Sequence, residues 1–262
     1  MITVDLPSSA ALEAASAAFT LALVGIGILI VGSAVAAATW ARSLNGWALG
    51  GVSFVLSQTA LFVVPVALNL LIPGNLVATL VITGLASAVF QEVSRAVIFA
   101  TAARNLPGRR GAGVFGFGHG SIDLFINFVI PSFVSMVLIG AVIDGSIFSE
   151  RTSEEIQQIN LFVVSNLIST EIDAVLKIMQ AALILALNYL LASFVFRSVI
   201  RGGGPRAIGR GLLLPAAIHT PVAVVRTLFP GVTMPVLLLA LLVAALVYRR
   251  GQETTVESAP NQ

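Results

Sequence analysis

The chain contains no cysteine, and this absence excludes disulfides, thiolate metal ligands and a cysteine nucleophile together. Only 10% of its 262 residues are charged and only two are histidine, whereas 57% are hydrophobic and the mean hydropathy is +1.00. A soluble domain of this length needs far more polar surface, so the composition predicts an integral membrane protein. No basic stripe with interleaved aromatic residues is present, which argues against a nucleic-acid partner.

The beginning of the chain lacks the basic segment that precedes the apolar core of a secretory signal. Met1–Leu12 carries Asp5 as its only charged residue. We therefore expect the apolar run that follows to be retained as a transmembrane helix.

Apolar runs of the length that crosses a bilayer as a helix, about 20 residues, recur along the chain. They predict an all-α fold: a polytopic bundle of about seven transmembrane helices, multi-pass in the cell membrane, with the lipid bilayer as its surroundings. We expect residues 1–250 to form one such domain. The runs are Ala17–Trp40, Trp47–Ile72, Leu76–Ala103, Gly113–Ile139, Lys177–Phe196, Ala207–Leu228 and Val232–Tyr248.

Basic residues gather in alternate connectors between these runs. Cytoplasmic loops are enriched in Lys and Arg, so the pattern predicts the N-terminus outside, the C-terminus inside and a short polar cytoplasmic tail at residues 251–262. The connector at about residues 144–170 is acidic instead, and the helical spacing of its Glu155–Ser169 part predicts an interfacial helix on the outer face. The residues that define the orientation are Arg42, Arg104, Arg109, Arg110, Arg197, Arg201, Arg206, Arg210, Arg249 and Arg250.

Five ionisable residues lie deep inside the predicted helices, where each costs at least a few kcal/mol and marks a functional site by default. At a rise of 1.5 Å per residue from the nearest basic connector, they lie about 13–20 Å deep, within about two helical turns of one another. Glu92 and Arg95 share a helix face at a spacing of three, and His119 and Asp123 share another at a spacing of four. The five candidate site residues are Glu92, Arg95, His119, Asp123 and His219.

Glycines surround the first of the two histidines, in the run Gly116-Phe-Gly-His-Gly120. Small residues four apart let the backbone of a neighbouring helix come close. Side chains of facing helices are therefore expected within hydrogen-bond range here. The same glycines do not form a nucleotide-binding fingerprint, because no strand precedes them and the spacing differs.

These side chains suit hydrolysis of a peptide bond near the inner leaflet. A buried carboxylate such as Glu92 can act as general base towards a water, while Arg95 holds it ionised. The two imidazoles would orient the water, stabilise a tetrahedral oxyanion or protonate the leaving amine. A metal site is the rival chemistry, with His119, His219 and Glu92 binding zinc (Zn) beside an open position for water. The sequence has no H-E-x-x-H helix, so the prediction is either no cofactor or zinc.

Simple structural roles are the alternatives for the same residues. Glu92 and Arg95 would form an ion pair that fixes their helix in the bundle, and His119 would be a core histidine bonded to a backbone carbonyl. Arg226 is predicted to extend its side chain to the outer interface.

Three segments resemble the YhfC-like branch of the CPBP (CAAX protease and bacteriocin-processing, or Abi) intramembrane protease family. They are Gln91-Glu-Val-Ser-Arg95, Gly116-Phe-Gly-His-Gly-Ser-Ile-Asp123 and His219. Proteins of this branch look like E-E-x-x-R on one helix, G-x-G-H-G-x-x-E on the next and a His on a later helix. The resemblance implies that Glu92 is the water-activating glutamate or its neighbour, His119 its catalytic partner and His219 part of the oxyanion site. It implies a glutamic-type protease acting on a membrane-protein or peptide substrate, although this branch is often labelled a metalloprotease.

The chain departs from the family pattern at four places, one of them Met179 and Gln180 on the fifth predicted helix, where a further histidine is expected. Gln91 stands where the first glutamate is usual, Asp123 where a glutamate is usual, and Ala223 four residues after His219, where a polar residue is expected. Two alternatives to a hydrolase therefore stay open. The charges at mid-depth also suit a small membrane transporter or ion-conducting protein, and the substitutions suit a catalytically inactive, protease-like membrane scaffold.

Overall fold

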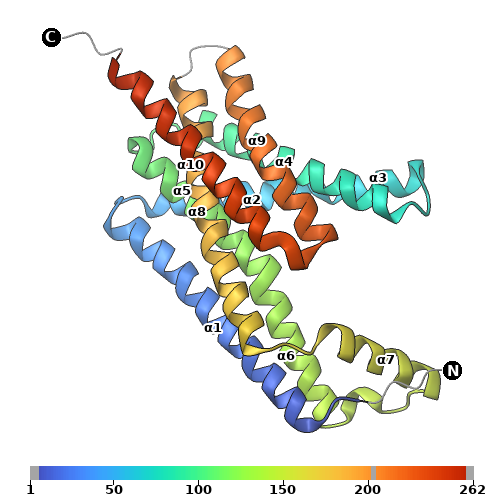
Figure 1. Ribbon diagram of the computed structural model, residues 1–262. Coiled ribbons are helices and arrows are strands. Elements are labelled where there is room, and N and C mark those ends of the chain that lie inside the picture. Colours follow the sequence, from blue (N-terminus) through green and yellow to red (C-terminus); the bar gives the residue numbers. More distant parts are fainter. Residues whose placement is uncertain (1–5, 202–204, 258–262) are drawn as a thin grey trace. The chain divides into compact units, whose positions relative to one another are not determined.

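The computed structural model describes residues 6–201 and 205–257, and these residues form helices joined by short turns, without a strand among them. The predicted all-α class is confirmed for this part of the chain. In chain order (Figure 1), the elements are α1 (Ser9–Thr39), α2 (Leu44–Leu61), α3 (Val63–Leu71), α4 (Leu76–Ala100), α5 (Gly108–Leu124), η1 (Phe125–Val129), α6 (Ile130–Ile143), η2 (Ser146–Phe148), α7 (Ser153–Asn166), α8 (Glu171–Arg201), α9 (Pro205–Leu228), η3 (Pro230–Val232) and α10 (Thr233–Glu257).

Five stretches of the described residues are long and apolar enough to cross a membrane as helices. They confirm a helical membrane protein, and each overlaps one of the first five predicted runs. Two later helices contain apolar parts that are shorter, Gly211–Arg226 and Thr233–Arg249. The five long stretches are Ser9–Thr39, Leu44–Leu68, Leu76–Ala100, Gly108–Ile143 and Glu171–Ile200.

Proline accounts for two interruptions that the sequence analysis did not predict. Pro65 has no N–H for the carbonyl of Leu61, and α2 ends at that residue. Pro131 lies in the first turn of α6, where its ring would clash with the carbonyl of Asn127. The π-helix η1 contains Asn127 and widens the helix at this point, so the chain continues from α5 into α6.

Contacts divide the chain into two compact units, which are described separately below. Unit 1 comprises Met1–Val31 and Leu124–Ala181, and unit 2 comprises Gly32–Asp123 and Ala182–Gln262. The single domain expected over residues 1–250 stays a prediction.

In unit 1, α1, α6 and α7 enclose an apolar core. Small residues let α1 approach the first part of α8, where Ala18 and Ala22 pack against Ala174. Lys177 lies over the ring of Phe19, 4.4 Å from its centroid, so this ammonium is stabilised by the aromatic face. The buried core residues are Leu12, Ala15, Phe19, Ile139, Val142, Val163 and Leu167.

Helix α7 begins with a capping box. The Thr152 side chain accepts a hydrogen bond from the Glu155 backbone N–H, and the Glu155 carboxylate accepts one from the Thr152 backbone N–H. The helix predicted in Glu155–Ser169 is thus present, and it begins slightly earlier, at Ser153. Its position at the membrane surface stays a prediction.

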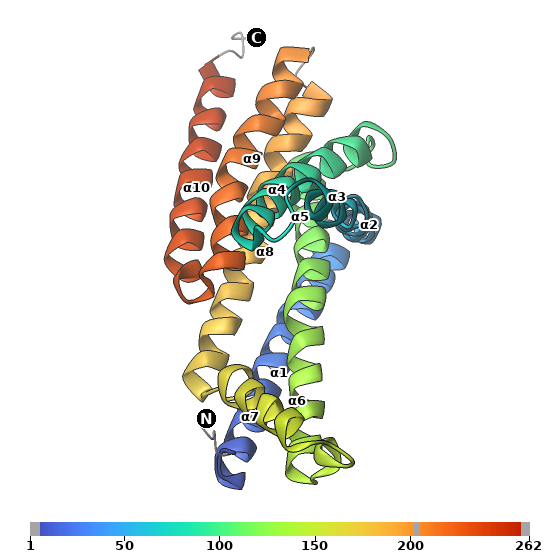
Figure 2. The same ribbon diagram turned by 90° about the vertical axis from the view of Figure 1, so that its right-hand side faces the viewer.

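In unit 2, helix α4 packs against both α2 and α9, and α9 lies beside α10 (Figure 2). An aromatic cluster joins α4 to α5 and α8: the Phe99 ring lies 4.3 Å from that of Phe115 and 5.2 Å from that of Phe196. All three rings are buried. The helices that carry Glu92, Arg95, His119 and Asp123 are therefore held together by a shared apolar core.

Several sequence predictions fall partly outside the described residues. Asp5 lies outside them, as do the side chains of Arg201, Arg206, Arg210 and Arg250. The polar tail expected at residues 251–262 starts as a continuation of α10 up to Glu257, and its last five residues, 258–262, also lie outside.

Candidate functional site

The glycine-rich run of α5 brings this helix into backbone contact with two neighbours. A Cβ atom added to Gly116 would overlap the backbone of Asn188 on α8, and one added to Gly118 would overlap the carbonyl of Trp47 on α2. Gly120 faces α8 again, where an added Cβ would lie 3.2 Å from the Asn188 amide nitrogen. The close approach expected from these glycines is confirmed, and it positions His119 between two helices.

A buried ion pair on α4 is the centre of the site. Arg95 Nη1 donates to Glu92 Oε1 over 2.6 Å, and the two side chains are 0% and 1% exposed. They lie three residues apart on one face of α4, as the spacing predicts. A charge buried without a partner would cost several kcal/mol, so each of these residues depends on the other.

The second histidine joins this pair from α9. His219 Nδ1 lies 3.3 Å from Glu92 Oε1, the same oxygen that accepts from Arg95. An ionised carboxylate can only accept, so Nδ1 of His219 is the atom that carries the hydrogen. Pro215 and Pro221 lie inside α9 on either side of His219. These prolines remove backbone donors near the histidine without ending the helix.

Helix α8 contributes a residue that the sequence analysis did not single out. Arg95 Nη2 donates to Oδ1 of Asn188. The Asn188 amide is itself fixed, because its Nδ2 donates to the Ile184 carbonyl over 2.9 Å. Asn188 therefore presents its oxygen to the guanidinium and holds the terminal nitrogen of Arg95 that does not contact Glu92. An amide near the middle of a mainly apolar run was the signal in the sequence.

His119 makes its contact with the residue next to the ion pair. Its Nε2 lies 3.1 Å from Gln91 Oε1, while Gln91 Nε2 donates to the Ser87 hydroxyl over 3.2 Å. With the amide oriented in this way, His119 Nε2 carries the hydrogen and Nδ1 has a free lone pair. The Phe54 ring meets the imidazole edge to face, with 5.2 Å between the centroids, and restricts its rotation.

Three polar atoms in this part of unit 2 are buried without a hydrogen-bond partner among the described residues. They are Glu92 Oε2, Arg95 Nε and His119 Nδ1. Leaving such an atom unpaired costs about 1–3 kcal/mol. One acceptor on a carboxylate, one acceptor on an imidazole and one guanidinium donor are the kinds of group that bind a water and a carbonyl.

Asp123 pairs with a residue of α9 that the sequence analysis did not connect with it. Arg226 Nη1 on α9 lies 3.2 Å and 3.4 Å from the two carboxylate oxygens of Asp123. Arg226 is 29% exposed and Asp123 is 4% exposed, so this is a second, partly buried ion pair within unit 2. The sequence analysis predicted that Arg226 extends to the interface and did not predict this ion pair. The pair fixes Asp123, which lies four residues after His119 on α5.

Zinc binding was the alternative chemistry for these residues, and it needs their side chains arranged around one metal ion. Among the described residues, no group of three or more His, Cys, Asp or Glu side chains is arranged to hold a metal ion. Of the proposed set, Glu92 Oε1 is occupied by Arg95 and His219, and His119 Nε2 faces Gln91. Glu92 Oε2 and His119 Nδ1 keep acceptors without a hydrogen-bond partner among the described residues, so the zinc alternative stays a prediction.

The structure thus joins Glu92, Arg95 and His219 directly and adds Asn188 to them. His119 contacts Gln91, the residue that precedes Glu92 on α4. Comparison of the chain with protein-family models, with curated proteins and with solved structures found no match.

The close packing of α5 makes a stability prediction. Replacement of Gly118 by alanine forces a methyl group against the Trp47 carbonyl, and we expect it to lower the free energy of unfolding by about 1–3 kcal/mol or more. Gly32 is the matched control, because it is also helical and in unit 2 but has nothing within 4 Å of an added Cβ. Gly32→Ala should be neutral or stabilising by up to about 1 kcal/mol. Equal denaturation midpoints for the two variants in detergent would contradict the close approach.

Proposed function

We propose that this protein is an intramembrane peptidase similar to the YhfC-like CPBP proteases. It would hydrolyse a peptide bond of a membrane-protein or peptide substrate near the inner leaflet. The observation that carries the proposal is the state of Glu92: one oxygen is held by Arg95 and His219, and the other is buried with no hydrogen-bond partner among the described residues. This is the arrangement required of a positioned general base.

In the proposed reaction, the two free acceptors take the two hydrogens of one water. Glu92 Oε2 removes a proton as the water oxygen attacks the peptide carbonyl carbon, and His119 Nδ1 accepts the other hydrogen and orients the water. Arg95 Nε–H is the donor available to the tetrahedral oxyanion. When the carbon–nitrogen bond breaks, the proton held by Glu92 passes to the leaving amine.

Asn188, Gln91 and His219 act as positioning residues in this scheme. Asn188 and Glu92 hold the two terminal nitrogens of Arg95, so the guanidinium is fixed. Gln91 accepts from His119 Nε2 and so selects the tautomer with a free Nδ1. On this account the glutamine preserves an acceptor at the position where the family usually has a glutamate.

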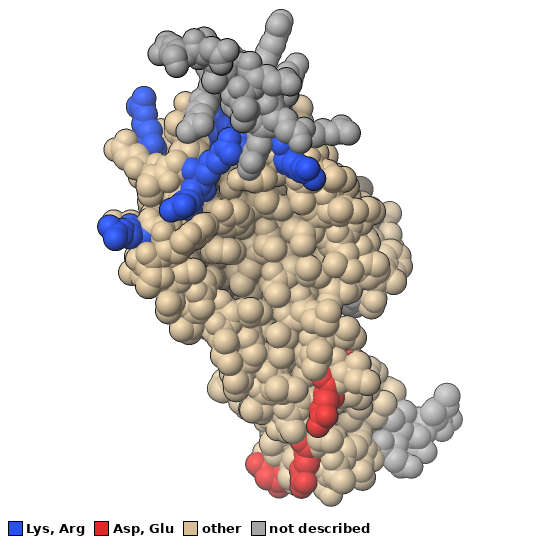
Figure 3. Space-filling model, turned by 60° about the vertical axis from the view of Figure 1, so that its left-hand side comes forward, with Lys and Arg blue, Asp and Glu red and all other residues tan. Residues whose placement is uncertain are grey.

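We further propose the seven-span topology, with the N-terminus outside, the C-terminus inside and the site facing the cytoplasm. Two features support it. The apolar parts of α9 and α10 correspond to the sixth and seventh predicted runs. The charges also divide between the units: unit 1 holds Glu13, Asp144, Glu150, Glu154, Glu155, Glu171 and Asp173 against Arg151 and Lys177. On the face of unit 2 in Figure 3, Arg side chains gather, which favours a cytoplasmic surface.

The topology can be tested directly because the chain has no cysteine of its own. Single cysteines introduced as Ser153→Cys and Gly231→Cys should react with a membrane-impermeant maleimide in intact cells. Arg104→Cys should react only after permeabilisation, since it lies in a basic connector. Labelling of Gly231→Cys only after permeabilisation would contradict the sixth and seventh spans.

The peptidase proposal predicts cleavage of a membrane-tethered peptide by the purified, reconstituted protein. Glu92→Gln keeps the shape but removes the base, and we expect it to lower the cleavage rate by about 10²–10⁴-fold, the usual contribution of a general base. His119→Ala should lose a comparable part of the rate. The control is Glu154→Gln, an exposed carboxylate on α7, which should cleave at the wild-type rate.

The rate of each variant is measured below its own unfolding temperature in detergent and expressed per folded molecule, so that loss of rate is separated from loss of fold. Cleavage that persists in both Glu92→Gln and His119→Ala would refute the assignment. Flux of ions across proteoliposomes that depends on Glu92, without cleavage, would instead identify a transporter. Partner binding without any hydrolysis would identify an inactive scaffold.

A further inference from the structure

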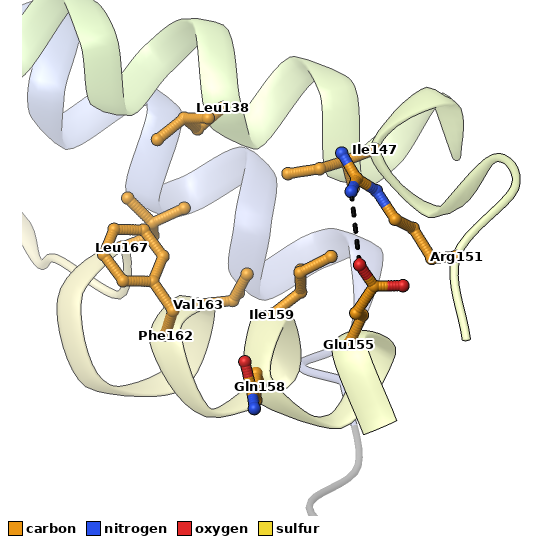
Figure 4. Close-up of a pocket in the computed structure, with 9 residues that line it drawn as sticks. All are labelled: Leu138, Ile147, Arg151, Glu155, Gln158, Ile159, Phe162, Val163 and Leu167. Atoms are coloured by element: carbon orange, nitrogen blue, oxygen red, sulfur yellow. Dashed lines mark hydrogen bonds and ion pairs between the residues drawn. The ribbon is translucent and has the colours of Figure 1, made fainter. Parts of the chain in front are cut away.

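A pocket of about 400 Å³ lies within unit 1, bounded by α6, η2 and α7 (Figure 4). Its lining is polar at one end and apolar elsewhere. This pocket is separate in the chain from every residue of the proposed peptidase site, all of which belong to unit 2. The lining residues are Leu138, Ile147, Arg151, Glu155, Gln158, Ile159, Phe162, Val163 and Leu167.

One face of α7 supplies most of this lining, at the spacing of a single helix face. Along that face the side chains change from polar at the N-terminal end to apolar at the C-terminal end. Glu155 and Gln158 lie in the first turns, and the positions that follow are Ile159, Phe162 and Val163. From Gln158 to the end of the pocket at Leu167 is about 13–14 Å of helix at 1.5 Å per residue.

The polar end carries one cation and one carboxylate that are only loosely paired. Arg151 Nη1 lies 3.5 Å from Glu155 Oε1, and the Arg151 side chain is 52% exposed, so most of its donors face outward. Glu155 Oε2 is occupied by the backbone N–H and hydroxyl of Thr152. These hydrogen bonds hold the pKa of Glu155 below its usual value, so it is a carboxylate at neutral pH.

We propose that this pocket binds one zwitterionic phospholipid with a primary ammonium group, such as phosphatidylethanolamine. An acyl chain would lie along Ile159, Phe162 and Leu167, the phosphate would pair with Arg151, and the ammonium would face the carboxylate of Glu155. The segregation of polar and apolar lining along α7 matches an amphiphile, and the Glu155 carboxylate beside Arg151 selects the headgroup. A headgroup with net negative charge would bring its excess charge to this carboxylate with no ammonium to offset it, which is unfavourable.

The site does not depend on the proposed peptidase activity, and it can be tested without an activity assay. Delipidated full-length protein in detergent is titrated with phosphatidylethanolamine or phosphatidylglycerol of the same acyl chains, and bound lipid is measured by native mass spectrometry. We expect phosphatidylethanolamine to bind more tightly. Arg151→Gln should weaken its binding about tenfold, because a charge-assisted hydrogen bond to the phosphate is lost.

Two further variants distinguish the contribution of the headgroup contacts to lipid binding from that of the apolar wall. Arg104→Gln removes an exposed arginine of unit 2 and should leave lipid binding unchanged. Ile159→Ser makes the pocket wall polar and should weaken both lipids without altering the preference between them. Equal binding of the two lipids, or no effect of Arg151→Gln, would overturn the proposal. Displacement of the lipid by an apolar peptide but not by a second phospholipid would show that the pocket is a peptide site.

Discussion

The ion pair between Glu92 and Arg95 determines how the helices of unit 2 pack. Both side chains are buried inside an apolar bundle, where either charge alone would be costly. Opposite charges 2.6 Å apart reduce that cost, and the remaining donors of Arg95 and the acceptor Oε1 of Glu92 bring in partners from other helices. Asn188 from α8 accepts a hydrogen bond from Arg95, and His219 from α9 donates one to Glu92. The pair therefore links α4 to α8 and α9 by polar contacts that apolar packing alone would not specify.

Small residues make this arrangement sterically accessible. Gly116 and Gly120 let α5 approach α8 at the position of Asn188, and Gly118 does the same towards α2. His119 lies between these glycines, so the backbone contacts that bring the helices together also fix its ring beside Gln91 and Phe54. The side chains of the site are therefore restricted to few orientations, and a reaction in a low-dielectric interior requires such preorganised groups.

Part of this structure could be predicted from the sequence, and part could not. Long apolar runs predicted the helices, because hydropathy and length are local properties. The spacing of Glu92 and Arg95 predicted their contact for the same reason. Asp123 shares a helix face with His119, yet its partner is Arg226, which lies 103 residues away. The hydropathy of a run does not determine which helices pack against each other. Neither the Asp123–Arg226 pair nor the contact of Asn188 with Arg95 was therefore predicted. The breaks at Leu61 and in η1 depend on single prolines within otherwise continuous apolar runs.

The central claim is that Glu92 is a charged carboxylate held by Arg95, and a double-mutant cycle tests it most directly. Unfolding free energies are compared for Glu92→Gln, Arg95→Gln and the double variant in the same detergent. Each single variant leaves a buried charge without its partner and should lose about 3–5 kcal/mol. The double variant should be destabilised by clearly less than the sum of the two losses, with a coupling of about 2–3 kcal/mol. Losses that simply add would contradict the claim, because they would mean that the two charges do not interact in the folded protein.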